Sequence, residues 1–444
     1  MLFPPGPKLN QGEQLQLLRR TPLRFFDDCH QKFGRIFTLN LGTFGNQEVD
    51  TEANGKWVFI TRPEDVETLF KTSPEIAMAG VANKMLFGSR TQQGGIIRLD
   101  GREHMNIRRV YQPIFNGNRM RAYTLPIMAT IRRHARLWSR SRAFPMLPEM
   151  QRITIDVIAK SILGFDESEL FDMLCSRLMC LENAAIQGRD RHMAERELSR
   201  IIHEHIATNR TTDLSDREDV FSRLCQLTKP DGLALTDKEL HDELVTLLKA
   251  GFGTTSNALA WLFACILEKE TVRARIQEEA MNAVGGREPA KCRFDQMPYT
   301  EAVIQETLRL CPSVAGFTGV RYLSEPLRLG GYTIPAHTVV AIATHILHRD
   351  ASVYPDPLLF KPERFLTAKP SAWRWAPFGG GNRMCVGRSF AMHEMKVVLA
   401  TLFSDMEINL DRPVGGSEVQ GFFCSPKDRG PHVRIKDRSH DEES

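Results

Sequence analysis

The chain has 444 residues, of which 42% are hydrophobic and 25% are charged. This composition is typical of a globular protein with a large core and excludes a disordered or fibrous chain. The formal net charge of +4 is too small to indicate a general nucleic-acid binder. The nine cysteines form no CxxC pair, which favours a reducing compartment over a disulfide framework. Because the first residues lack the pattern of a signal peptide, we expect a cytoplasmic protein without a membrane anchor.

The first predicted elements are strands over residues 34–42 and 56–62, which are rich in β-branched and aromatic residues between glycines and polar turns. From about Pro63 to Ala280 the pattern is mostly helical. No linker divides the sequence, so we expect one mainly α-helical domain with a minor β part over residues 1–444. The tail from about residue 436 is expected to be frayed.

One long helix is predicted to start at Asp237, after a capping box in which Thr236 and Glu239 satisfy free backbone groups. It continues without proline through the run AGFGTT at residues 250–255. Each glycine inside a helix costs about 1 kcal/mol. The run therefore indicates either a close helix crossing or a groove opened for a ligand, and alone it favours the crossing.

After residue 312 the pattern becomes mixed, with strand-like runs at 327–335 and 339–344 and a last helix near Gly387. The segment FGGGNRMCVG at 378–387 is the most informative one. Its glycines permit positive φ angles and close approach to a flat ligand. Cys385 precedes a helix, whose N-terminus favours a thiolate, and Arg383 suits a carboxylate. An inert buried cysteine is the weaker alternative.

At these residues the chain resembles the cytochromes P-450, the haem-thiolate monooxygenases, whose ligand loop reads F-x-x-G-x-R-x-C-x-G. The resemblance implies the cytochrome P-450 fold, with a long central helix over the haem and small β-sheets. It also implies haem b (iron protoporphyrin IX) as cofactor, with Cys385 as its axial thiolate and metal ligand. The loop residues assigned to cofactor binding are Phe378, Gly379, Arg383, Cys385 and Gly387.

Four further segments match the family in chain order. Glu306 and Arg309 form its E-x-x-R on one helix face, and Arg364 in the following P-E-R-F completes a buried structural triad. Upstream, His104 and Arg108 are i,i+4 neighbours in a segment that resembles the helix at the haem edge. The resemblance assigns these two residues to the haem propionates, together with Arg383 and Arg321. A solvated basic helix face is the alternative for His104 and Arg108.

The long helix matches the family's A/G-G-x-acid-T-T/S, except that Gly253 stands at the acidic position. The resemblance makes Thr254 and Thr255 catalytic, since the family's threonine assists oxygen activation while the acid helps to bring protons. Without that acid, protons must come through waters, Asn257 or another group. This departure opens a peroxide-driven or isomerising variant.

The expected pocket is apolar, which implies a lipophilic small-molecule substrate such as a fatty acid or terpenoid. The resemblance further implies O2 as co-substrate and a separate ferredoxin and ferredoxin reductase as electron donors, and we expect a monomer. Ordinary core packing is the alternative for every pocket residue, and solvation the alternative for every docking residue. The expected pocket residues are Ala250, Phe252, Val314, Ala315, Phe317 and Phe422, and the expected docking residues are Arg102, Arg109, Arg388 and Lys396.

These features are compatible with three functions. The leading one is a monooxygenase that hydroxylates or epoxidises its substrate. Gly253 suggests, as a second, a peroxygenase or a haem-thiolate isomerase or dehydratase. The third is a non-enzymatic thiolate-haem sensor, against which Thr254 and the apolar pocket argue.

Overall fold

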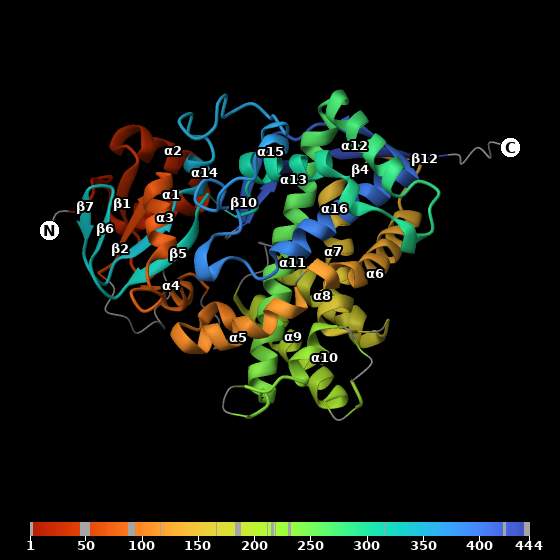
Figure 1. Ribbon diagram of the computed structural model, residues 1–444, viewed down its shortest axis with the longest axis horizontal. Helices are drawn as coiled ribbons and strands as arrows, with labels where there is room; N and C mark the ends of the chain where they lie inside the picture. Colours follow the sequence, from red (N-terminus) through yellow and green to blue (C-terminus); the bar gives the residue numbers. More distant parts are fainter. Residues whose placement is uncertain are drawn as a thin grey trace.

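The structure is a computed structural model that describes residues 3–44, 54–87, 94–115, 117–165, 167–182, 188–210, 212–214, 217, 219–229, 232–314, 316–420 and 423–438. Its N-terminal helices and most β-strands lie on one side of the molecule, and the larger helical part lies on the other (Figure 1). The helices other than the long central one are α1 (Gln11–Arg20), α2 (Pro22–Phe33), α3 (Pro63–Lys71), α4 (Ala79–Leu86), α5 (Gly101–Ile114), α6 (Gly117–Arg136), α7 (Met146–Leu163), α8 (Glu169–Glu182), α9 (Gly188–Asn209), α10 (Val220–Cys225), α12 (Glu270–Ala283), α13 (Pro298–Leu310), α14 (Thr344–Leu347), α15 (Arg364–Thr367) and α16 (Arg388–Asp405).

The long central helix, α11 (Asp237–Leu267), runs through the middle of the molecule (Figure 1). The predicted capping box of Thr236 and Glu239 is present at its start. A Cβ atom on Gly251 would lie 3.0 Å from Cδ1 of Ile158 on α7, so this glycine permits the close helix crossing. Among the described helices α11 alone is long and apolar enough to cross a membrane, but 78% of its apolar window is buried inside the protein.

The largest sheet has the strand order β1-β2-β8-β5-β3. The antiparallel pair predicted from the sequence is confirmed as β1 (Ile36–Asn40) and β2 (Lys56–Ile60). β2 also pairs in parallel with β8 (Val339–Ile342), which comes much later in the chain. The remaining strands are β3 (Ala77–Met78), β4 (Phe144–Pro145), β5 (Thr318–Leu323), β6 (Leu327–Leu329), β7 (Tyr332–Ile334), β9 (Met406–Arg412), β10 (Ser417–Gln420), β11 (Phe423–Pro426) and β12 (His432–Asp437).

Successive side chains of β1 and β2 point to opposite faces of this sheet, as the strand period requires. Both faces are buried, because each contributes to its own hydrophobic cluster. The cluster with α2 and α4 contains Phe37, Leu39, Trp57 and Phe59, and the cluster with α3 contains Ile36, Val58 and Ile60.

The prediction that the chain is frayed from residue 436 is wrong for residues 436 and 437. Strand β12 pairs with β9 through Asp437, and Arg140 binds the Asp437 carboxylate at 2.7 Å. Backbone pairing and this ion pair together hold residues 436–437, and the rest of that expectation, over 439–444, lies outside the described residues.

Candidate cofactor and substrate site

The loop before α16 has the tight geometry that its glycines suggested. Gly379 and Gly381 have φ angles of 63° and 65°, and a Cβ on Gly381 would lie 2.6 Å from the backbone oxygen of Phe70. The Cys385 N–H donates to the Phe378 carbonyl at 3.0 Å. The loop is thereby folded back on itself, with Cys385 just before the N-terminus of α16.

Cys385 is exposed, yet desolvation is the largest influence on its pKa. Neighbouring protein atoms therefore desolvate the thiol although part of its surface is accessible. Hydrogen bonds from the N–H groups of Gly387 and Arg388 and the charge of Arg108 lower the pKa, but desolvation outweighs them and raises it. The stabilised thiolate expected from the helix N-terminus thus needs a further cation, which a haem iron would supply.

Four basic side chains from distant segments influence one another near this loop. His104 is buried, and burial with the charges of Arg383, Arg108 and Arg321 lowers its pKa to about 3. Burial and the charge of Arg383 lower the pKa of Arg321 to about 9, and burial lowers that of Arg383 to about 10. These four form the basic cluster, with a neutral imidazole and three guanidinium groups.

The basic cluster is short of anions. Arg383 pairs with Asp100, whose carboxylate also accepts the N–H groups of Gly80 and Val81 at 2.8 and 2.9 Å. Arg108 donates to the Met384 carbonyl at 2.7 Å, and the buried Nε of Arg383 has no hydrogen-bond partner among the described residues. Two haem propionates would supply the missing negative charge, so these residues fit the cofactor.

The centre of α11 presents one accessible face within an otherwise buried helix. Ala250 is exposed and Thr254 is half-buried, and the Thr254 hydroxyl donates to the Ala250 carbonyl at 2.7 Å. Thr255, expected to be catalytic, is only 4% exposed. That expectation is wrong in position, since Thr255 lies on a buried side of the helix.

The backbone at Gly253 is tied to the C-terminal strands. The Asn257 amide donates to the Gly253 carbonyl at 2.7 Å, and the Ser425 hydroxyl donates to Asn257 Oδ1 at 2.7 Å. Asn257, one of the groups considered for proton delivery, is therefore held in a fixed orientation by Gly253 and Ser425.

The expected pocket residues are brought together only in part. Phe252 is 1% exposed within the helical core. Phe317 is 4% exposed and packs against the rings of Phe26 and Phe59 at 6.0 and 5.8 Å. Both are core residues, so their assignment to the pocket is corrected. Val314 is half-buried and bridges to Phe423 on β11, whereas Ala315 and Phe422 lie outside the described residues.

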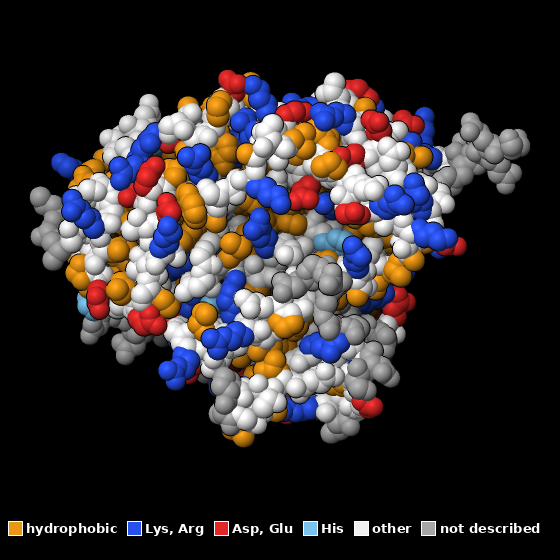
Figure 2. All heavy atoms as spheres, viewed as in Figure 1, with side chains coloured by type: hydrophobic (Ala, Val, Ile, Leu, Met, Phe, Trp, Pro, Cys, Tyr) orange, Lys and Arg blue, Asp and Glu red, His pale blue; other side chains and the backbone are white. Residues whose placement is uncertain are grey.

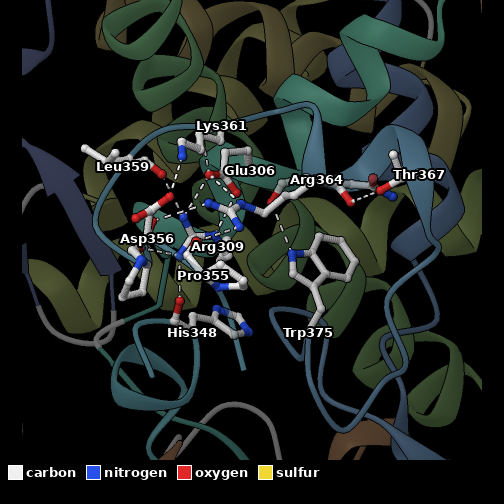
Figure 3. A network of polar contacts seen from close by, with 12 residues as sticks. Glu306, Arg309, His348, Pro355, Asp356, Leu359, Lys361, Arg364, Thr367 and Trp375 are labelled. Atoms are coloured by element: carbon white, nitrogen blue, oxygen red, sulfur yellow. Dashed lines mark hydrogen bonds and ion pairs between the residues drawn. The ribbon is translucent and has the colours of Figure 1, made fainter. Parts of the chain in front are cut away.

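The structural triad forms as the motif predicts. Arg309 donates from Nε and Nη2 to the two carboxylate oxygens of Glu306 at 2.7 and 2.8 Å, and Arg364 Nε reaches Glu306 at 3.2 Å (Figure 3). The remaining Arg309 hydrogen bonds end on the carbonyls of His348, Pro357 and Leu359. This network connects α13 to the segment before α15.

A basic face lies over α5, where Figure 2 shows Lys and Arg side chains gathered around the middle of the molecule. Arg102 and Arg109 are exposed there, and Arg388 is half-buried. Lys396 is not part of this face, because it is 13% exposed and paired with Glu301 at 2.7 Å.

Sequence reasoning missed Asp100. Asp100 stands directly before α5, so an acid at that helix start was a usable signal.

Comparisons with known proteins agree with this geometry. Residues 3–417 match the family model described as Cytochrome P450. Cytochrome P450 135B1 of Mycobacterium tuberculosis is 31% identical over 98% of this chain and 92% of its own, and cytochrome P450 138 of the same organism is 32% identical over 96% and 94%. The structure of cyanobacterial CYP120A1 bound to retinoic acid has a TM-score of 0.83 at 25% identity, covering 98% of this chain and 99% of that one. The cytochrome P450DA heme domain shares the fold, with a TM-score of 0.80 at 20% identity over 99% and 98%.

Proposed function

The chain belongs to the cytochrome P450 family of haem-thiolate monooxygenases, and from this premise we propose that Cys385 is its haem ligand. The observation that carries the proposal is the accessible Cys385 sulfur beside a basic cluster that is short of anions. His104, Arg108, Arg321 and Arg383 would hold the propionates. When bound, the haem supplies the oxygen-activating chemistry.

The other residues of the site act on what surrounds the cofactor. Phe378, Gly379 and Gly387 belong to the loop that carries the sulfur, and the Phe378 carbonyl accepts the Cys385 N–H. Thr254 offers a hydroxyl on the accessible face of α11. Its hydrogen is donated to the Ala250 carbonyl, so its oxygen would accept a hydrogen bond from a bound water and position that water for proton transfer. Ala250 keeps that face apolar.

The proposed substrate is a lipophilic fatty acid or terpenoid that is hydroxylated or epoxidised with O2. Retinoic acid, an apolar terpenoid acid, is bound by the cyanobacterial relative at 25% identity, which supports this class. The proposed electron donors are a ferredoxin and its reductase, and the basic face over α5 supports an acidic partner. We further propose that the protein is a single-domain monomer in the cytoplasm.

One observation favours a second function. Gly253 supplies no carboxylate, and Asn257 is held by Gly253 and Ser425. A peroxide-driven peroxygenase or an isomerase needs no proton delivery to bound O2, so these enzymes tolerate the change.

The decisive experiment compares Cys385→Ser with Cys292→Ser, a half-buried cysteine elsewhere in the chain. We expect Cys385→Ser to lose the thiolate spectrum of the CO-bound ferrous protein and Cys292→Ser to keep it. Turnover with NAD(P)H, ferredoxin and reductase identifies a monooxygenase, turnover with hydrogen peroxide alone identifies a peroxygenase, and conversion of an oxidised lipid with neither identifies an isomerase or dehydratase. A thiolate spectrum retained in Cys385→Ser contradicts the proposed ligand.

A further inference from the structure

Two cysteines outside the cofactor site lie in contact where α11 packs against α13. The sulfur atoms of Cys265, near the end of α11, and Cys311, directly after α13, are 4.0 Å apart. The two residues are 46 positions apart in the chain, and both are half-buried. Their sulfurs must approach by about 2 Å to reach the disulfide length of about 2.05 Å, a displacement that rotation of the two side chains can supply.

The surroundings make the two sulfurs chemically unequal. Both lie at the C-terminal end of a helix, where the helix dipole disfavours a thiolate. Arg349, however, donates from a terminal nitrogen to the carbonyl of Leu310, the residue before Cys311, so a guanidinium group lies beside Cys311. A neighbouring cation favours a thiolate. Cys311 is therefore the nucleophile of the pair.

The pKa values of the thiols agree with this order. Donation from the Cys265 S–H and the charge of Arg349 lower the pKa of Cys311, whereas the same hydrogen bond and burial raise the pKa of Cys265. Burial raises the pKa of Cys29, in another part of the chain, to about 12. Because the thiolate is the form that reacts with an oxidant, Cys311 should react before Cys29.

Strand β11 joins the segments that carry the pair. Trp261 on α11 donates from Nε1 to the Cys424 carbonyl at 3.0 Å, and the Cys424 N–H donates to the Ser313 carbonyl at 3.0 Å. The next residue after Ser313 is the half-buried Val314, which bridges to β11. A covalent bond between the two cysteines would therefore fasten α11 to the segment that leads to Val314.

We propose that Cys265 and Cys311 are a redox-active dithiol, which hydrogen peroxide oxidises to a disulfide that links α11 to α13. The Cys311 thiolate attacks one peroxide oxygen, the O–O bond breaks, and the other oxygen takes up a proton and leaves as water. The Cys265 sulfur then attacks the sulfenic acid of Cys311, and the S–OH oxygen leaves with the Cys265 proton as a second water. Two thiols and one peroxide thus give one disulfide and two waters, and the proposal does not rest on the proposed function.

The test treats the haem-loaded protein with a small excess of hydrogen peroxide, blocks the remaining thiols with N-ethylmaleimide and maps the peptides by mass spectrometry. We expect a peptide pair joined through Cys265 and Cys311 that dithiothreitol separates. The oxidised protein should melt about 4 °C higher than after dithiothreitol, because the disulfide lowers the entropy of the unfolded chain.

Three variants identify the partners. Cys265→Ala should abolish the joined pair and leave a sulfenic acid at Cys311 that dimedone labels. Cys424→Ala should keep the joined pair, and so should Cys29→Ala, the matched control at a buried cysteine.

Two results would overturn the proposal. One is a wild type in which Cys311 is alkylated as fully after peroxide as before, and the other is a Cys311 that is linked to Cys424 or oxidised to sulfinic acid instead of linked to Cys265. Failure of the proposed function shows separately, because the spectrum of the CO-bound ferrous protein reports on Cys385 and the peptide map reports on the dithiol.

Discussion

Glu306 and Arg309 face each other through two parallel hydrogen bonds while both side chains are fully buried. The Glu306 carboxylate also accepts the Lys361 N–H at 2.8 Å, so the pair connects α13 to a segment that runs to α15. A buried charge whose partner is removed keeps its desolvation penalty and loses its compensation.

We therefore expect Arg309→Met to lower the free energy of unfolding by about 3–5 kcal/mol. The double variant Glu306→Gln/Arg309→Met should lose less than the sum of the two single changes. Denaturant unfolding measures all three. Lys291→Met, in an exposed i,i+3 pair with Glu288, is the control, and equal losses in Lys291→Met and Arg309→Met would contradict the stabilising role.

The second prediction concerns the basic cluster. Arg321→Met removes a buried cation whose charged form is disfavoured by burial and by Arg383. Without haem, the variant should melt at a higher temperature than the wild type. Its affinity for haem should be about tenfold or more lower than that of the wild type.

Haem transfer to apomyoglobin and calorimetric melting measure these two effects. Arg328→Met, at an exposed arginine of β6, should change neither. Unaltered haem affinity in Arg321→Met would remove Arg321 from the proposed propionate partners.

The third prediction concerns proton supply at Gly253. If the missing acid limits O2-driven turnover, Gly253→Asp should raise coupled product formation with redox partners, since a positioned acid contributes about 10²–10⁴-fold. Peroxide-driven turnover should not rise. Because Gly253 is buried, an unchanged thiolate spectrum must first show that the variant is intact. Lower coupling in an intact variant would favour the peroxide-driven or isomerising function.

The fourth prediction is an acid sensitivity that His348 confers. This side chain is fully buried and its Nε2 accepts the Ala376 N–H at 3.0 Å, and burial with the charges of Arg309 and Arg349 lowers its pKa to about 3. Between pH 6.5 and 3 the unfolded chain binds a proton that the folded protein excludes. Stability is thus lost as the pH falls through this window, by at most about 1.4 kcal/mol per pH unit.

His348→Gln, which keeps an acceptor for Ala376, should show a shallower loss of unfolding free energy from pH 6.5 to 4. His192→Gln, at an exposed histidine of α9, is the comparison. A slope identical to that of the wild type would exclude His348 as a source of the acid sensitivity.

The sequence correctly predicted those features that depend on residues close together in the chain. The capping box at Thr236, the β1–β2 pair and the glycine loop before Cys385 depend on neighbouring residues, and each is present. Which face of a long helix becomes accessible depends instead on elements far along the chain. Phe252 and Thr255 were therefore assigned to the site although they pack into the core.

The balance of charges around the site could not be predicted from the sequence either. Arg383 and Arg321 could be named from motifs, but their shortage of anions follows only from how few carboxylates the fold brings near them.

The parallel pairing of β2 with β8 has a consequence for biosynthesis. The two strands are about 280 residues apart in the chain, an interval that lasts roughly 14 to 56 s on a ribosome adding about 5–20 residues per second. Throughout that time the backbone N–H and C=O groups on the outer edge of β2 have no β8 partner, which favours association with other emerging chains. Slower translation lengthens this interval, so the yield of soluble protein should depend more strongly on chaperone supply when synthesis is slow.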